Sequence, residues 1–384
     1  TPKVSRLNSA IYPIPVKKQA KYNISRWAVT GRDDLWLNSM CYRIAKYLFK
    51  TKNKNPEGWR ELCELWASDF RTHITEKRWK KAKKQLSSLL KRYSIKDNFS
   101  DCYKQFNPQA YSPLEKVIGK HQGFIIDLIK ENTLLRISSP KLLITLNLRR
   151  GLTINSLALT SHGMEPCIGT LPHGHFSSIK HGVDYYSGGV VVELPIERKR
   201  VTDLEKVVPY FLVNNNAIEV HVLIPSILGD IYKVIKVTPE KEKVTLSYHF
   251  PEWGRPVGSI RLGNITMMPK MFDKNIKLSC VNDEGHNQSF ALDSMVSHHL
   301  PSSTLVSSSG GIEATTGSIF VESNQNKIEL EWNTSDCAVM PMLQYDPTLT
   351  NSLTRIFFSM LEADDTTKKS DNLGSFCFSI FPPN

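Results

Sequence analysis

The stretch GWRELCELWASDFRTHITEKRWKKAKKQLSSLL, from Gly58 to Leu90, decides how the fold is interpreted. Its apolar side chains recur at spacings that keep them on one side of a helix: Leu62, Leu65, Trp79, Leu86 and Leu89. Continuing the same line through the gap after Leu65 places polar side chains among the apolar ones: Asp69, Thr72 and Glu76, with His73 one turn after Asp69. The pattern predicts one long helix, near 61–91, whose apolar side is interrupted by ionisable groups.

These interruptions have two interpretations. A buried carboxylate without a partner costs several kcal/mol, so the helix needs either matched cations or a polar ligand at this place. Arg71 and Arg78 are close enough in sequence to form buried ion pairs at a helix–helix contact. The alternative is a binding site for a polar molecule.

A second helix is predicted before this one, near 35–49, in GRDDLWLNSMCYRIAKYLFK. Asp33 and Asp34 suit its first turn, where free amides and the helix dipole favour carboxylates. The inward row then continues through Asn38 to apolar residues. Because the connection KNKNPEG is short, the two helices form an antiparallel pair, and their polar stretches approach each other. Simple capping is the competing explanation for the two aspartates.

A third helix is predicted near 114–130, after the capping signal Ser112, Pro113 and Glu115. Beyond residue 132 the hydrophobic period changes from 3.6 to 2. The runs that predict strands are 142–161, 190–196, 217–224, 231–239, 243–250, 274–281, 318–324, 327–333, 353–362 and 376–382. We therefore predict an α+β chain with an extended arm over 1–30, a three-helix bundle over 31–132 and a large antiparallel β-sandwich over 133–384.

Composition narrows the class of protein. The chain has 384 residues, 40% of them hydrophobic, and no apolar run long enough to span a bilayer, so no membrane association is expected. Its seven cysteines are scattered and form no CxxC pair, which disfavours a disulfide framework and a zinc knuckle. Reduced cysteines and a cytoplasmic location are the expectation. The sequence begins without methionine, which suggests a processed or partial chain.

The net charge of +12 is concentrated between Lys77 and Lys96, a run with cations and no acidic residue. Such a run could bind nucleic acid or another polyanion. A solvated helix face is favoured over this alternative, because aromatic residues are not interleaved with the cations and no nucleic-acid motif is present.

A glycine-rich segment over 169–195 gathers polar and aromatic side chains: His173, His175, His181, Asp184, Tyr185 and Tyr186. The histidine spacing matches no strong metal motif, so no metal or other cofactor is predicted. Structural hydrogen bonding within the loop and ligand contact by the rings both remain open. A second glycine loop, over 307–317, exposes its backbone but lacks the lysine and the helix of a phosphate-binding loop.

Four strings together resemble a known family. They are KKQAKYNISRWAVTGRDDLWLNSMCYRI (17–44), WRELCELWASDFRTHITEKRW (59–79), ITLNLRRGLTINSLAL (144–159) and GVDYYSGGVVVELPIERKRVTDLE (182–205). They resemble the region after the catalytic barrel in a bacterial branch of family 57 type glycoside hydrolases, relatives of the family 38 alpha-mannosidases. The resemblance implies a β/α barrel first, then a helical bundle and a mutarotase-like β-sandwich.

The barrel itself is missing from this sequence, and in the family it holds the nucleophile and the acid/base. No residue here inherits those roles, so the catalytic residues stay unknown. The resemblance implies that the helices contribute to the rim of a carbohydrate site through Arg32, Asp33, Asp34, Asn38, Asp69, Arg71, Thr72, His73 and Glu76. The loop residues Asp184, Tyr185 and Tyr186 are added as candidate sugar contacts.

The expected function is therefore the C-terminal part of a glycoside hydrolase or glucanotransferase acting on alpha-linked polysaccharide, with an N-terminal barrel in cis. Taken alone, the chain is expected to be inactive. A non-catalytic carbohydrate-binding or scaffold protein is the first alternative, and a polyanion binder using the basic helix is the second.

Overall fold

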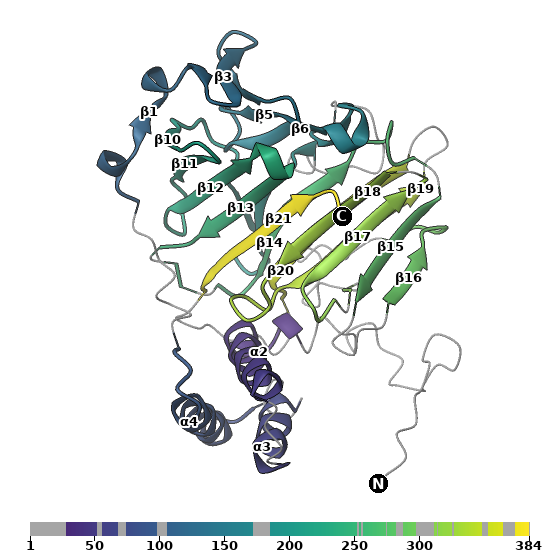
Figure 1. Cartoon of the computed structure of the whole chain (residues 1–384). Helices are drawn as coiled ribbons and strands as arrows, with labels where there is room; N and C mark the ends of the chain where they lie inside the picture. Colours follow the sequence, from purple (N-terminus) through teal and green to yellow (C-terminus); the bar gives the residue numbers. More distant parts are fainter. Residues whose placement is uncertain are drawn as a thin grey trace.

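A computed structural model shows a β-sandwich with helices packed against one end of it (Figure 1). The structure describes residues 28–51, 56–67, 74–97, 106–171, 185–251, 253–254, 256–273, 275–281, 287–296, 311–312, 314–324, 326–347, 352–363 and 373–383. Within these residues the helices are α2 (Asp34–Lys50), α3 (Pro56–Trp66) and α4 (Glu76–Arg92). Each of these three helices contacts the other two.

The single long helix predicted near 61–91 is wrong, because two helices cover this stretch. α3 ends at Trp66, and α4 begins at Glu76. The side chain of Thr75 caps α4 by accepting a hydrogen bond from the amide of Arg78 at 3.4 Å, which satisfies one of the free donors in the first turn. The predicted apolar positions are nevertheless buried in both helices, including Leu62, Leu65 and Trp79.

The third predicted helix, near 114–130, is also wrong. Gly119 and Gly123 have backbone φ angles of +136° and +85°, which a right-handed helix does not contain. The run after them, rich in β-branched residues, forms β3 (Phe124–Ile129), which pairs antiparallel with β4 (Leu134–Ser138). Strand pairing thus begins well before residue 133.

Among the described residues, one sheet has ten strands. In spatial order they are β1 (Ser112–Pro113), β10 (Tyr210–Val213), β11 (Ile218–Ile224), β12 (Ile231–Thr238), β13 (Lys243–His249), β21 (Ser375–Phe381), β18 (Asn326–Trp332), β17 (Ser318–Ser323), β15 (Ile276–Val281) and β16 (Asn287–Ala291). The antiparallel sandwich predicted from the period of two is confirmed, and β21, the last of the described strands in sequence order, lies in the interior of this sheet.

The second sheet has eleven strands within the part of the chain that the structure describes. Nine follow one path: β19 (Met340–Pro347), β20 (Ser352–Leu361), β14 (Ser259–Met267), β7 (Pro166–Gly169), β6 (Thr153–Leu159), β5 (Leu142–Asn147), β4, β3 and β2 (Gly119–His121). β8 (Gly189–Leu194) pairs with β14 and also with β9 (Lys199–Thr202), off this path. A hydrophobic core fills the space between the two sheets.

A buried ion pair crosses this core. Lys233 and Asp203 are fully buried, and the Lys233 ammonium donates to Asp203 Oδ2 at 2.9 Å and to the carbonyl of Gly151 at 2.7 Å. Burial lowers the pKa of Lys233, and the Asp203 carboxylate works against that shift. Gly151 has φ of +59°, as its hairpin requires, and a Cβ there would lie 1.8 Å from the Asp203 carbonyl oxygen.

Helix α2 is tied to the sandwich through the turn over 333–338. Arg43 Nε donates to the carbonyl of Ser335 at 2.7 Å, and Lys46 Nζ donates to Asn333 Oδ1 at 2.7 Å. The amide of Ala338 donates to Ser39 Oγ at 2.9 Å. Three side chains on successive turns of α2 therefore fix this helix against one loop of the sandwich.

No helix in the described part of the chain is long and apolar enough to cross a membrane.

Candidate functional site

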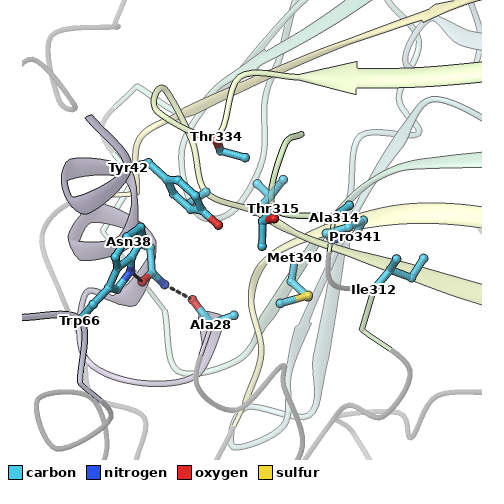
Figure 2. Close-up of a pocket in the computed structure, with 12 residues that line it drawn as sticks. Ala28, Asn38, Tyr42, Trp66, Ile312, Ala314, Thr315, Thr334, Met340 and Pro341 are labelled. Atoms are coloured by element: carbon cyan, nitrogen blue, oxygen red, sulfur yellow. Dashed lines mark hydrogen bonds between the residues drawn. The ribbon is translucent and has the colours of Figure 1, made fainter. Parts of the chain in front are cut away.

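A pocket lies where α2 and α3 meet the sandwich (Figure 2), with a volume of about 160 Å³. Its lining comes from parts of the chain that are as much as 313 residues apart, Ala28 and Pro341. The lining residues are Ala28, Asn38, Tyr42, Trp66, Ile312, Ala314, Thr315, Thr334, Ala338, Val339, Met340 and Pro341. Apolar and aromatic surface with a few polar groups is typical of small-molecule sites.

Asn38 is the central polar group on the helical side. Its side chain is 5% exposed, and its Nδ2 donates to the carbonyl of Ala28 at 3.0 Å. Its Oδ1 accepts a hydrogen bond from the indole nitrogen of Trp66 at 2.8 Å. Asn38 therefore joins the start of the described chain, α2 and the end of α3, and it fixes the Trp66 ring beside the pocket.

Tyr42 stands one turn after Asn38 and lines the same pocket. Its ring meets the Trp66 ring edge to face, with centroids 5.0 Å apart and an interplanar angle of 87°. Figure 2 shows Tyr42 reaching from α2 toward Thr315 on the sandwich side. The pocket thus combines two aromatic rings with an amide and hydroxyl groups, which is the combination that suits a ring bearing several hydroxyl groups.

The segment before α2 is held against the sandwich by packing, in addition to the contacts of α2 with the 333–338 turn. Ala28 and Val29 pack against the Met340, Met342 and Phe357 side chains of β19 and β20. The amide of Glu362 donates to the carbonyl of Val29 at 3.0 Å. The segment before α2 is thereby anchored on the sheet. These contacts fix the distance between the helical side and the sandwich side of the pocket.

The first predicted rim residues lie at the start of α2. Asp33 is its N-cap residue with φ of +51°, but its side chain does not cap the helix, so the capping explanation is wrong for it. Asp34 is fully buried, and its Oδ2 accepts a hydrogen bond from the amide of Gly31 at 2.7 Å. Arg32 forms an ion pair with Glu76, and its guanidinium lies 5.5 Å from the centroid of the Trp79 ring. Arg32 and Glu76 thus connect the segment just before α2 with the start of α4.

Other predicted residues lie elsewhere. Tyr185 is buried with Leu171 and Leu353, and Tyr186 packs on the same cluster, away from the pocket lining. Five predicted site residues are outside the described residues: Asp69, Arg71, Thr72, His73 and Asp184. His173, His175 and His181 are also outside them. Within the described ranges, no group of three or more His, Cys, Asp or Glu side chains is placed to hold a metal ion.

The basic run forms most of α4. Its apolar residues Trp79, Ala82, Leu86, Leu89 and Leu90 are buried, and its lysines and arginines are exposed. A solvated helix face and a polyanion-binding face both require exposed cations, so this arrangement does not choose between the two predictions.

Sequence reasoning missed Tyr42, Trp66, Thr315 and Thr334. Tyr42 follows Asn38 by four residues, so helical spacing could have placed both side chains on one face of α2. The two threonines carry no comparable signal, because only the tertiary fold brings their loops to α2.

No protein-family model and no curated protein matches the sequence. Among solved structures, the chain is similar to a galactose mutarotase-like protein from Clostridium acetobutylicum, with 10% identity and a TM-score of 0.42, over 67% of this chain and 97% of that one. It is also similar to the 4-alpha-glucanotransferase from Thermococcus litoralis, with 9% identity and a TM-score of 0.34, over 91% of this chain and 50% of that one.

A third similar structure is a GH36 alpha-galactosidase from Geobacillus stearothermophilus, with 6% identity and a TM-score of 0.35, over 67% of this chain and 40% of that enzyme. The chain therefore spans half the length of the glucanotransferase and less than half of the galactosidase. At these identities and scores the similarities establish neither a family nor an activity.

Proposed function

We propose that this chain is the carbohydrate-binding C-terminal part of a glycoside hydrolase or glucanotransferase of the family 57 type, acting on alpha-linked polysaccharide. The observation that carries the proposal is the pocket between α2, α3 and the sandwich, where Asn38 and Tyr42 meet the Trp66 ring. The sequence resemblance quoted above supports the same assignment, because its strings at 17–44 and 59–79 contain these three residues.

The chemistry of the lining supports binding. A sugar ring offers apolar C–H faces to aromatic rings and hydroxyl groups to amides and hydroxyls, and each buried polar group needs a partner to offset its desolvation. Cleavage of a glycosidic bond uses two carboxyl groups about 5–10 Å apart. In this proposal an N-terminal barrel of the same protein contributes those carboxyl groups, and the pocket positions the neighbouring sugar.

We expect the chain to bind maltoheptaose weakly, and Tyr42→Phe and Asn38→Ala to lower the affinity. Loss of a net hydrogen bond of about 1 kcal/mol corresponds to a roughly fivefold weaker Kd. Tyr42→Phe removes a single hydroxyl and keeps the ring that packs on Trp66. Isothermal titration calorimetry gives the affinities. Asn216→Ala, an exposed asparagine in the turn between β10 and β11, is the matched control and is expected to bind as the wild type does. Equal affinities for all four proteins would contradict the proposal.

We expect the purified chain to show no measurable turnover of alpha-glucan or mannan, because the acid and the nucleophile are assigned to the barrel. Reducing-end release is the measurement, with Asp69→Ala and Glu76→Ala measured in parallel. Robust turnover that either substitution abolishes would place a catalytic pair within this chain and would overturn the division of roles.

A further inference from the structure

We propose that a second pocket, on the outer face of the ten-stranded sheet, is a further subsite for the same sugar chain that the first pocket holds. This inference rests on the proposed function for the class of ligand. The second pocket has a volume of about 510 Å³, within the range of about 300–1,000 Å³ typical of ligand sites. Its side chains with polar groups include Lys46, His249, Glu331, Asn333, Asp336 and Ser375.

The strand register explains why the sheet is hollow at this place. Ser247 of β13 lies opposite Cys377 of β21, and Thr245 lies opposite Ser379. These small side chains point outward and alternate with large side chains that point inward. The outer surface of the sheet is therefore recessed here relative to the neighbouring charged residues. The hydroxyls of Thr245 and Ser379 are 2.8 Å apart, and His249 Nδ1 is 2.9 Å from Ser375 Oγ. The floor is thus an ordered polar surface.

The two pockets are neighbours along α2. Asn38 and Tyr42 line the first, and Lys46 lines the second. Their spacing of four residues places these side chains along one side of the helix over about 12 Å. The segment 314–316 and the 333–338 turn contribute to both pockets. The pockets therefore lie on either side of one turn, which favours an extended ligand over two unrelated small molecules.

A buried polar atom lies in the same region. Ser335 Oγ has no hydrogen-bond partner among the described residues, although Ser335 is only 7% exposed. Buried polar groups of proteins are nearly always paired, and an exception needs a partner such as a ligand or an ordered water. Ser335 belongs to the turn between the two pockets.

The charges fit a neutral ligand with many hydroxyl groups. Glu331 and Asp336 offer acceptors, while Lys46 and Asn333 offer donors. Lys46 donates to Asn333 Oδ1 at 2.7 Å, and Asn333 Nδ2 donates to Asp336 Oδ2 at 2.7 Å, so cation, amide and carboxylate already form one chain. A sugar hydroxyl, which both donates and accepts, can join such a chain at any point.

The test measures affinity against ligand length, with linear malto-oligosaccharides of two to seven units. We expect the wild-type chain to bind the longest about tenfold more tightly than the shortest, the effect of one or two net hydrogen bonds. Cys377→Tyr, which places a large ring on the exposed centre of the floor, should remove this gain and leave maltose affinity unchanged. Lys46→Ala should reduce the gain in part. Leu223→Tyr, an exposed position on β11 outside both pockets, is the control and should keep it.

The outcomes separate the two proposals. A gain with length that survives Cys377→Tyr comes from multiple binding registers in the first pocket, and it would overturn the second subsite alone. Equal affinities for maltose and maltoheptaose would also overturn the second subsite alone. If no oligosaccharide binds at any length, the proposed function and the subsite both fail.

Discussion

Replacing Asp203 by alanine is expected to lower the free energy of unfolding by about 3–5 kcal/mol. The Lys233 ammonium is fully buried and would lose its counter-ion, keeping the Gly151 carbonyl as its described partner. Asp203 Oδ1 also accepts a hydrogen bond from the amide of Val190 at 2.9 Å, so the substitution leaves a buried donor unpaired as well. Urea denaturation followed by circular dichroism measures the change.

The control is Glu240→Ala, which breaks an ion pair with Lys141 between exposed side chains and should leave the free energy of unfolding nearly unchanged. The pH dependence gives a second check. Because burial lowers the folded-state pKa of Lys233, the unfolded chain binds more protons, and stability rises with pH toward the ordinary lysine value of 10.5. The difference in the free energy of unfolding between the wild type and the Asp203→Ala variant should therefore decrease at high pH. A loss no larger than that of Glu240→Ala would contradict the prediction.

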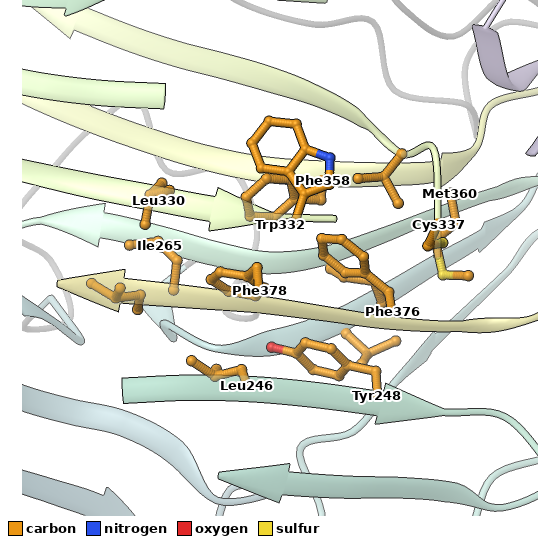
Figure 3. Packing of buried hydrophobic residues seen from close by; sticks show 14 of the residues in the cluster. Leu246, Tyr248, Ile265, Leu330, Trp332, Cys337, Phe358, Met360, Phe376 and Phe378 are labelled. Atoms are coloured by element: carbon orange, nitrogen blue, oxygen red, sulfur yellow. The ribbon is translucent and has the colours of Figure 1, made fainter. Parts of the chain in front are cut away.

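Phe358→Ala is expected to lower the free energy of unfolding by about 3–5 kcal/mol, because it opens a cavity at the centre of the sandwich. Phe358 is fully buried on β20, and its ring centroid lies 4.6 Å from that of Phe378, 5.0 Å from that of Phe376 and 5.1 Å from that of Trp332. Figure 3 shows these four rings gathered between the two sheets. Thermal and urea unfolding both report the loss.

Phe290→Ala is the matched control, because Phe290 is 47% exposed on the edge strand β16. Its effect should stay within about 0.5 kcal/mol. Similar losses for the two variants would mean that the rings around Phe358 close the cavity when its side chain is removed.

The sandwich could be predicted from the sequence because its strands carry a local signal. Runs such as 231–239 and 243–250 alternate inward apolar with outward polar residues, and the structure has β12 and β13 there. The period of two is fixed by the backbone, and turn residues mark where each strand ends. The partners of each strand could not be read this way, because pairing such as β13 with β21 joins residues about 130 positions apart.

The helical region shows how two local signals compete. Ser112, Pro113 and Glu115 form a good capping pattern, but Gly119 and Gly123 adopt left-handed backbone and the following apolar run pairs with a neighbouring strand. Tertiary pairing outweighed a capping preference worth about 1 kcal/mol. Only part of the candidate site could be predicted from the sequence. Asn38 could be found because it interrupts an apolar row, whereas Thr315 and Thr334 are brought to the site only by the tertiary fold.

The position of β21 has a consequence for how the protein is made. β21 inserts between β13 and β18, so until it has left the ribosome each of these strands presents a row of unpaired amides and carbonyls. Pairing between segments so distant in sequence also forms slowly. A nascent chain that ends before residue 375 therefore exposes the paired edges of β13 and β18, and exposed strand edges of this kind are prone to aggregation.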